Sequence, residues 1–183
     1  MTMEDEHLKE TTIHTDRIFD GRIIQVDHST VQLPDGSESK REIVYHNGAV
    51  SVIAVHRGLM YFVRQYRVAP DEVLFEIPAG KIEKGDIPHD AAVRELEEEI
   101  GATAGNIEQL FEFYVSPGFS NELVSLYEAK NIRLKDQKLD EDEFLDIEKV
   151  PLDRLHSLLM NGTIRDAKTI IAVQYVLSKY NLE

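Results

Sequence analysis

The first half of the chain alternates between polar and apolar positions with the period of β-strands. Residues 11–46 follow this pattern, and the sequence PDG supplies turn residues between two strands. We therefore expect a small antiparallel sheet here. A second β-rich stretch predicts a hairpin of residues 49–55 and 60–67, closed by the sequence HRGL. The sequence LFEIP predicts one more strand.

The clearest helix is predicted over residues 88–100. Pro88 suits the first turn, Asp90 favours the N-terminal end of the helix dipole, and Gly101 can adopt the left-handed conformation that ends a helix. Apolar residues recur at helical spacing and predict a buried stripe made of Ala92, Val93, Leu96 and Ile100.

The rest of the chain predicts further strands followed by two helices. FEFYVS and LVSLYEA read as strands, LDEDEF is an acidic loop, and the helices are PLDRLHSLLMNG and RDAKTIIAVQYVLSKYN. Asp166 is the expected N-cap of the last helix. The pattern predicts an α+β fold with a mixed sheet between helices, divided into an N-terminal β unit (1–46) and a main domain (47–183).

Composition limits the partners and the ligands. The 183 residues are 42% hydrophobic, enough for one compact domain or one domain with a small appendage. A net charge of -14 argues against nucleic acid and anionic membrane as partners. With no cysteine, a metal site must use oxygen or histidine, which favours Mg²⁺ or Mn²⁺. The acidic N-terminus and the lack of a long apolar run predict a cytoplasmic protein.

Acidic residues are crowded at the C-terminal end of the predicted helix. Glu95, Glu98 and Glu99 share a face, whereas Glu97 points elsewhere and is expected to be solvated. Each like-charge contact costs roughly 0.2–0.5 kcal/mol, and carboxylates in the last turn also oppose the helix dipole. A solvated glutamate-rich face is one interpretation. A platform for divalent cations is the other, because a cation relieves this repulsion.

The spacing of residues around the helix resembles the Nudix box of the Nudix hydrolase family. The matching positions are Gly80, Arg94, Glu95, Leu96, Glu98, Glu99, Gly101 and Ala102. Asp86 is the one departure, since the family usually has glutamate there, and its shorter side chain could weaken the contact made at this position.

The resemblance implies a Nudix fold and a set of metal ligands. Glu95 and Glu99 would bind metal directly, Glu98 would bind or share a second metal, and the Ala79 carbonyl would add a ligand. Arg94 would hold the carboxylates in place. Metal bound to the substrate's diphosphate would neutralise its charge and lower the pKa of a bound water.

Residues outside the box resemble the ADP-ribose pyrophosphatase branch of the family. Pro117 lies sixteen residues beyond Gly101, in the sequence FYVSPGFSNE, and the likeness extends to SKREIV, FEIPAGKIEKG, LDEDEF and DAKT. Serine, proline and glycine together are otherwise typical of an ordinary turn.

The branch implies substrate contacts and a homodimer. In this branch the N-terminal sheet commonly crosses to a second protomer. Arg41 and Glu42 are therefore expected to contact the substrate of the partner subunit. Further substrate contacts are expected from Phe19, Arg67, Ser116 and Glu122. Phe19 would stack on adenine, although a single aromatic in a strand is also typical of a core position. Arg67 would bind phosphate or ribose, because a guanidinium suits paired oxygens.

The nucleophile is expected to be water, so a general base should lie near the metals. Read alone, LDEDEF is a solvated acidic turn. The branch implies that Glu141 is the base and Glu143 a further metal ligand, and the two roles could be exchanged.

These patterns predict a Mg²⁺- or Mn²⁺-dependent enzyme that cleaves ADP-ribose into AMP and ribose 5-phosphate. Its partner would be this small-molecule substrate. Three alternatives remain open at this point: the same chemistry on a nucleotide sugar or dinucleotide, a non-catalytic nucleotide-binding Nudix module, and a structural α+β protein that binds a cation.

Overall fold

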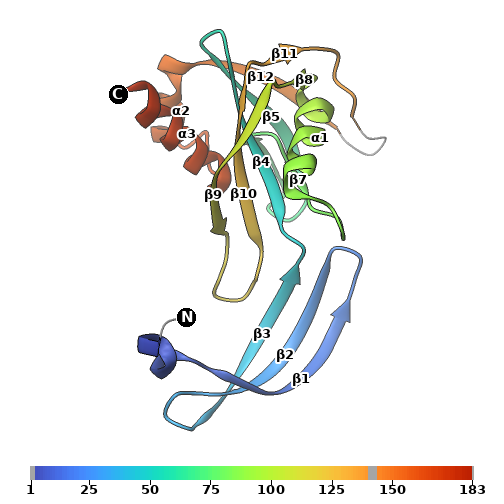
Figure 1. Ribbon diagram of the computed structural model, residues 1–183, viewed down its shortest axis with the longest axis vertical. Helices are drawn as coiled ribbons and strands as arrows, with labels where there is room; N and C mark the ends of the chain where they lie inside the picture. The colour runs from blue at the N-terminus through green and yellow to red at the C-terminus, as the bar shows by residue number, and fades with distance from the viewer. Residues whose placement is uncertain (1–2, 140–143, 183) are drawn as a thin grey trace. The chain divides into compact units, whose positions relative to one another are not determined.

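The computed structural model describes residues 3–139 and 144–182, which form two compact units (Figure 1). The first unit holds the chain up to Asn47 together with Tyr114–Leu123, and the second holds Gly48–Phe113 and the chain from Val124 onward. The predicted division into an N-terminal β unit (1–46) and a main domain (47–183) stays a prediction.

The first unit is built on the expected antiparallel sheet. A short 3₁₀ helix, Met3–Leu8, precedes three strands in the order β1 (Thr11–Asp20), β2 (Ile24–Gln32) and β3 (Glu38–His46). The 114–123 segment joins this sheet, because the amide of Val44 donates to the Phe119 carbonyl (2.7 Å) and the amide of Asn121 donates to the Val44 carbonyl (3.2 Å).

The second unit contains the mixed sheet that the sequence predicts. Its strands run in the order β12-β5-β4-β10-β9, with β6 paired to β5 and β7 paired to β4. β10 is parallel to β4, whereas β5 and β7 are antiparallel to it. The bounds of these strands are β4 (Ala49–His56), β5 (Leu59–Arg67), β6 (Glu72–Glu76), β7 (Ala79–Lys81), β9 (Asn106–Tyr114), β10 (Leu123–Lys130) and β12 (Leu145–Pro151).

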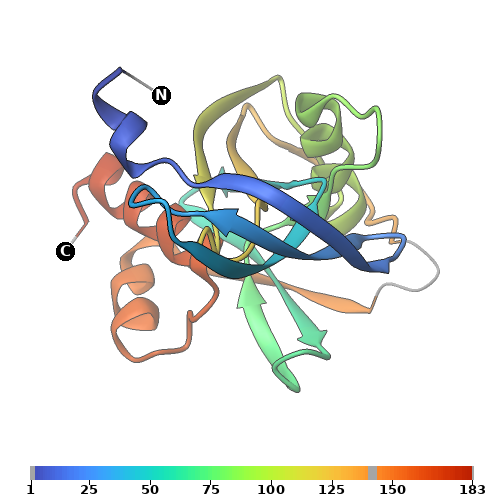
Figure 2. The same ribbon diagram turned by 90° about the horizontal axis from the view of Figure 1, so that it is seen from below.

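Helices cover the two faces of this sheet, as Figure 1 and Figure 2 show. Helix α1 (Pro88–Ile100) lies on one face, and α2 (Leu155–Met160) with α3 (Ala167–Tyr180) lies on the other. Because side chains alternate along a strand, β4 serves both layers. Val50 and Val52 belong to the cluster that includes α1, and Ile53 belongs to the cluster that includes α3.

Short elements complete the second unit. β8 (Ala102–Thr103) pairs with β11 (Arg133–Leu134) just beyond α1, and the 3₁₀ helix Leu152–Arg154 leads into α2. No helix of the described residues is long and apolar enough to cross a membrane.

The ends of α1 and α3 agree with the sequence. Pro88 is the first residue of α1, Gly101 ends it in the left-handed conformation (φ 58°), and Asp166 caps α3 by accepting from the amide of Thr169. One position of the predicted apolar stripe is wrong: Val93 is exposed, and Ala91 is buried in its place. The buried face is rotated toward Ala91 because it also carries Glu95 and Glu99.

Candidate functional site: the acidic face of helix α1

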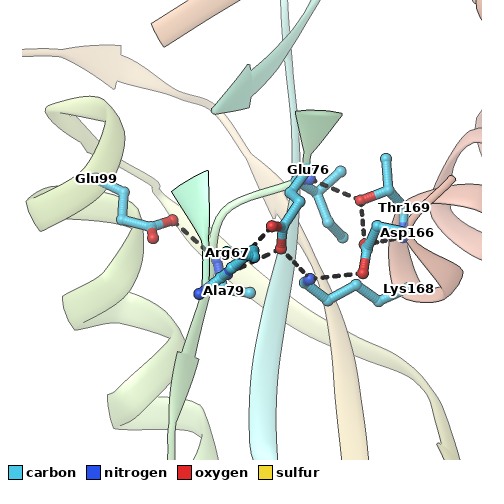
Figure 3. Close-up of polar contacts among 8 residues, drawn as sticks. Arg67, Glu76, Ala79, Glu99, Asp166, Lys168 and Thr169 are labelled. Carbon is cyan, nitrogen blue, oxygen red and sulfur yellow. Dashed lines mark hydrogen bonds and ion pairs between the residues drawn. The ribbon is translucent and has the colours of Figure 1, made fainter. Parts of the chain in front are cut away.

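Glu99 lies on the buried face of α1. Glu99 is 1% exposed. Its Oε2 accepts a hydrogen bond of 2.9 Å from the amide of Ala79, the first residue of β7 (Figure 3). A buried carboxylate is stable only when charge or hydrogen bonds compensate it. The predicted carbonyl ligand, Ala79, and the predicted carboxylate ligand, Glu99, are therefore neighbours.

Glu95 lies against the next residue of the same strand. A Cβ atom added to Gly80 would fall on the carboxyl group of Glu95. Glycine is required here because the carboxylate approaches the backbone too closely for any side chain. This contact explains why the first position of the sequence motif is a glycine.

Arg94 links the remaining acids. Its guanidinium lies 3.3 Å from Asp86 Oδ2, 3.3 Å from Glu95 Oε1 and 3.7 Å from Glu98 Oε2. Burial lowers the pKa of Arg94, but the hydrogen bonds and charges of Asp86 and Glu95 outweigh it, so the pKa lies above its ordinary value. Arg94 thus contacts Glu95 and Glu98, two of the three glutamates that it was predicted to hold in place, and this role stays a prediction.

Asp86 keeps its contact despite the shorter side chain. The same Oδ2 that accepts from Arg94 also accepts from the amide of Glu83 (3.2 Å), which fixes the loop before α1. The departure from the usual glutamate therefore leaves the link to Arg94 in place.

The donor set of this face fits a hard divalent cation. Three carboxylates and a backbone carbonyl are oxygen ligands of the kind that Mg²⁺ and Mn²⁺ prefer, and Gly80 leaves room for the Glu95 carboxylate at the backbone. Within residues 3–139 and 144–182, however, no three acidic or histidine side chains come close enough together to share an ion. Two of the three glutamates are instead directed to Arg94.

Glu97 is not simply solvated, in contrast to the expectation from sequence. It lies 3.7 Å from Lys135 Nζ and 3.5 Å from Lys138 Nζ. Residues 135–138 also satisfy carbonyl groups at the end of α1: Lys135 and Lys138 donate their amides to Gly101 and Glu98, and the Gln137 side chain donates to Glu99. This acid therefore helps to hold a chain segment against the helix end.

Residues 45–173, which contain all of these contacts, match the NUDIX domain family. The chain belongs to the Nudix family. Both the family and the α+β fold expected from its sequence motif are confirmed, and the protein is a Nudix hydrolase. Members of this family generally use divalent metal.

Three known proteins resemble this Nudix hydrolase over most of its length. A methanol dehydrogenase activator of Bacillus methanolicus is 46% identical over 92% of each chain. An ADP-ribose pyrophosphatase of Bacillus subtilis (strain 168) is 43% identical over 96% of this chain and 97% of its own. The crystal structure of an ADP compounds hydrolase has the same fold, with a TM-score of 0.83, 21% identity and 94% of each chain covered.

Arg67 of the Nudix hydrolase lies in an ion cluster that sequence reasoning missed. Its Nε and Nη2 donate to the two carboxylate oxygens of Glu76 (2.7 and 2.9 Å), and Glu76 also accepts from Lys168. Glu76 is 1% exposed although it stands in the apolar sequence LFEIP. An acid inside an apolar sequence was the signal that could have identified it.

The other predicted substrate residues belong to the first unit of the Nudix hydrolase. Arg41 pairs with Glu10 (2.6 Å), and the imidazole of His46 lies 3.8 Å from Glu122. The Ser116 carbonyl accepts from the amides of Phe119 and Ser120, so Ser116 begins a hydrogen-bonded turn.

Phe19 and Glu42 also lie in this unit. Phe19 is 53% exposed, so the alternative of a core position is wrong. Glu42 lines a cavity of about 410 Å³ in the same unit, together with Ile18, Val26, Asp27, His28, Val44 and Phe119.

Glu141 and Glu143, the residues predicted as base and further metal ligand, lie outside the described residues. Their roles in this Nudix hydrolase stay predictions.

Proposed function

We propose that the protein hydrolyses the diphosphate of ADP-ribose, yielding AMP and ribose 5-phosphate. The observation that carries this proposal is the 43% identity to an ADP-ribose pyrophosphatase over 96% of the chain. Likeness limited to the NUDIX domain would indicate only a reaction type. This likeness also covers the first unit, where five of the predicted substrate residues lie.

The reaction adds one water molecule across the diphosphate. The water oxygen forms a bond to one phosphorus, the bond from that phosphorus to the bridging oxygen breaks, and the second phosphate leaves with the bridging oxygen. A bound Mg²⁺ or Mn²⁺ would neutralise the diphosphate and make the water more acidic. Glu95, Glu98, Glu99 and the Ala79 carbonyl would hold this metal.

The protein's own residues would orient the substrate and move the proton. Arg94 would keep Glu95 and Glu98 at the helix surface, and Arg67 would bind a phosphate or ribose oxygen pair. Glu141 or Glu143 would accept the proton of the attacking water.

A cytoplasmic homodimer completes the proposal. β1 is exposed at all ten positions and presents the large apolar side chains of Ile13, Ile18 and Phe19. Apolar side chains gathered on one exposed strand are typical of an interface between protein chains. A partner subunit would cover them and would bring its Arg41 and Glu42 to the substrate.

A substrate panel tests the proposed activity. The purified protein is incubated with ADP-ribose, nucleotide sugars, dinucleotides and diadenosine polyphosphates, each with Mg²⁺, Mn²⁺ or a chelator, and the products are separated by chromatography. We expect ADP-ribose to give the highest kcat/KM, and the chelator to abolish turnover. A better substrate would redirect the proposal, and no metal-dependent hydrolysis of any compound would overturn it.

The variant Glu99→Gln tests whether the activity measured in the panel depends on the acidic face of α1. It keeps the oxygen that accepts from the Ala79 amide but removes one charge of the acidic face. We expect activity to fall by at least about two orders of magnitude, while the metal-free free energy of unfolding changes by less than about 1 kcal/mol because like-charge repulsion is relieved. Unfolding with unchanged activity per folded molecule would contradict the metal platform.

A second candidate function is the regulation of a dehydrogenase. It is favoured by the 46% identity to a protein described as a methanol dehydrogenase activator. Adding the protein to methanol dehydrogenase, with Glu99→Gln as a control, distinguishes the two. Activation by both forms would indicate a role that does not need hydrolysis.

A further inference from the structure

Arg67 is paired with the buried carboxylate of Glu76. Glu76 is at the end of β6, its side chain is 2% exposed, and both of its oxygens accept from the guanidinium of Arg67 at the end of β5 (Figure 3). Two parallel hydrogen bonds fix the plane of a guanidinium as well as its position. Arg67 therefore has a defined orientation before any ligand arrives.

The first turn of α3 completes this cluster. Lys168 donates to Glu76 Oε2 and lies 3.0 Å from Asp166 Oδ1. The other oxygen of Asp166 accepts from the amide and the hydroxyl of Thr169 (3.0 and 2.6 Å), and the Thr169 hydroxyl oxygen accepts from the amide of Ile77 (2.9 Å). The start of α3 is thus bonded to the residue that follows β6.

The opposite side of Arg67 faces the acidic helix. The hydrogen bonds to Glu76 raise the pKa of Arg67 above its ordinary value, and the negative charge of Glu99 raises it further. The side chain is 38% exposed, and among the residues that the structure describes its Nη1 makes no hydrogen bond. This nitrogen can therefore donate to an anionic ligand.

Lys168 offsets negative charge around Arg67. Glu76 and Asp166 each carry one negative charge, whereas Arg67 and Lys168 each carry one positive charge, so the four sum to zero. Without Lys168 the other three would sum to minus one and would repel a phosphate. Lys168 therefore preserves the attraction of Arg67 for an anion, while Glu76 prevents Arg67 from turning toward Glu99.

We propose that Glu76 and Lys168 are positioning residues that orient Arg67 toward a phosphate or ribose oxygen pair of the substrate. This inference rests on the proposed role of Arg67 in binding a nucleoside diphosphate derivative. The proposal gives the first turn of α3, which begins in the sequence DAKT (166–169), a role in substrate recognition.

The test compares Lys168→Met and Glu76→Gln with the wild type in steady-state hydrolysis and in calorimetric titration with the non-hydrolysable α,β-methylene analogue of ADP-ribose. We expect KM and the Kd of the analogue to rise about tenfold, the effect of weakening one hydrogen bond to a charged group, with kcat within about twofold because ground-state binding is lost. Lys168→Arg should restore both constants.

Two further variants exclude a general loss of structure. Glu128→Gln also alters a buried carboxylate paired with a lysine of α3, but that lysine, Lys179, is at the opposite end of the helix. It should leave KM and Kd unchanged. In the Arg67→Met background, Lys168→Met should have no further effect, because the lysine acts through the arginine.

The proposal is overturned if KM and Kd are unchanged in Lys168→Met, if the effects of Lys168→Met and Arg67→Met add in free energy, or if Glu128→Gln raises KM equally. Failure of the proposed function is a separate result, since it appears as a wild type that does not cleave ADP-ribose. The same variants are then compared on the best substrate of the panel and its methylene analogue. Lys168→Met alters a side chain that is less buried than Glu76 (14% against 2% exposed) and keeps the test valid should Glu76→Gln fail to fold.

Discussion

Gly80 shows how a missing side chain makes room for a carboxylate. The carboxyl group of Glu95 occupies the place where a Cβ atom at position 80 would be. Glu99 contacts Ala79, the residue before Gly80 in β7, by accepting a hydrogen bond from its amide. Both glutamates are therefore aligned on one short stretch of backbone, which is how the glycine and the distant acids of the sequence motif depend on each other.

Gly80→Ala is expected to reduce catalysis without unfolding the protein. Gly80 does not have a positive φ, so alanine adds no backbone strain, and the added methyl group displaces only the flexible end of Glu95. We predict a fall in kcat of at least about 100-fold and a change in unfolding free energy below about 1 kcal/mol. Steady-state kinetics and urea unfolding measure the two. Unchanged kcat would contradict the role of Glu95 at this backbone.

Glu76 should give the protein a specific loss of stability in acid. Burial raises its pKa, but Arg67 and Lys168 outweigh burial, so the pKa in the folded protein is below the ordinary value. The unfolded chain therefore binds the proton more readily. The stabilisation is complete above the ordinary glutamate pKa of about 4.3 and is lost as the pH falls through the lower folded value.

Glu76→Gln isolates this contribution. Breaking a buried ion pair costs about 3–5 kcal/mol, so the variant should be less stable than the wild type by this amount at pH 7. The difference should shrink as the pH falls below about 4.3. Urea unfolding of both proteins across this range measures it. A difference that does not change with pH would show that the charge of Glu76 is not the cause.

At the scale of elements, the ends of helices were predictable and the partners of those ends were not. Pro88, Gly101 and Asp166 are local signals, and each marks the expected end. The segment at 135–138 that satisfies the last carbonyls of α1 is distant in sequence and has no local pattern. Glu97 looked solvated for the same reason, since its lysine partners lie some forty residues away.

Gly101→Ala is expected to disturb this contact between segments. Gly101 has φ 58°, and an added Cβ would lie 2.5 Å from the Lys135 carbonyl oxygen and 2.7 Å from the Gln137 amide nitrogen. The left-handed conformation alone costs alanine about 1–2 kcal/mol. We predict a larger loss of unfolding free energy, because backbone atoms must also move.

Gly162→Ala provides the matched control for that variant. Gly162 also has positive φ (78°), but an added Cβ would meet nothing within 4 Å. It should therefore lose only the conformational cost of about 1–2 kcal/mol. Urea unfolding of both variants gives the comparison, and equal losses would show that the contact with residues 135–138 contributes no stability.

For the molecule as a whole, the sequence predicted the sheet, its helices and the acidic motif, because these follow local periodicity and fixed spacing. It missed the ion cluster of Glu76, Arg67 and Lys168, which β5, β6 and α3 bring together across 101 positions of the chain, from 67 to 168. The net charge of -14 is compatible with an anionic substrate only where cations offset it. Arg67 and Lys168 are two such cations, and both contact Glu76.

The exposed strand β1 carries the last prediction, a homodimer that depends on Ile18. This side chain is 64% exposed, beside Phe19 at 53%, and an aspartate at position 18 would place a charge in the proposed interface. We expect light scattering to give the wild type a mass of about 42 kDa, twice the chain mass of 20.9 kDa. Ile18→Asp should have the monomer mass and a kcat/KM at least about tenfold lower, because Arg41 and Glu42 of the partner would be absent. Met160→Asp, at a residue of α2 that is 71% exposed, should remain dimeric and active. A wild type with the monomer mass and full activity would refute the shared site.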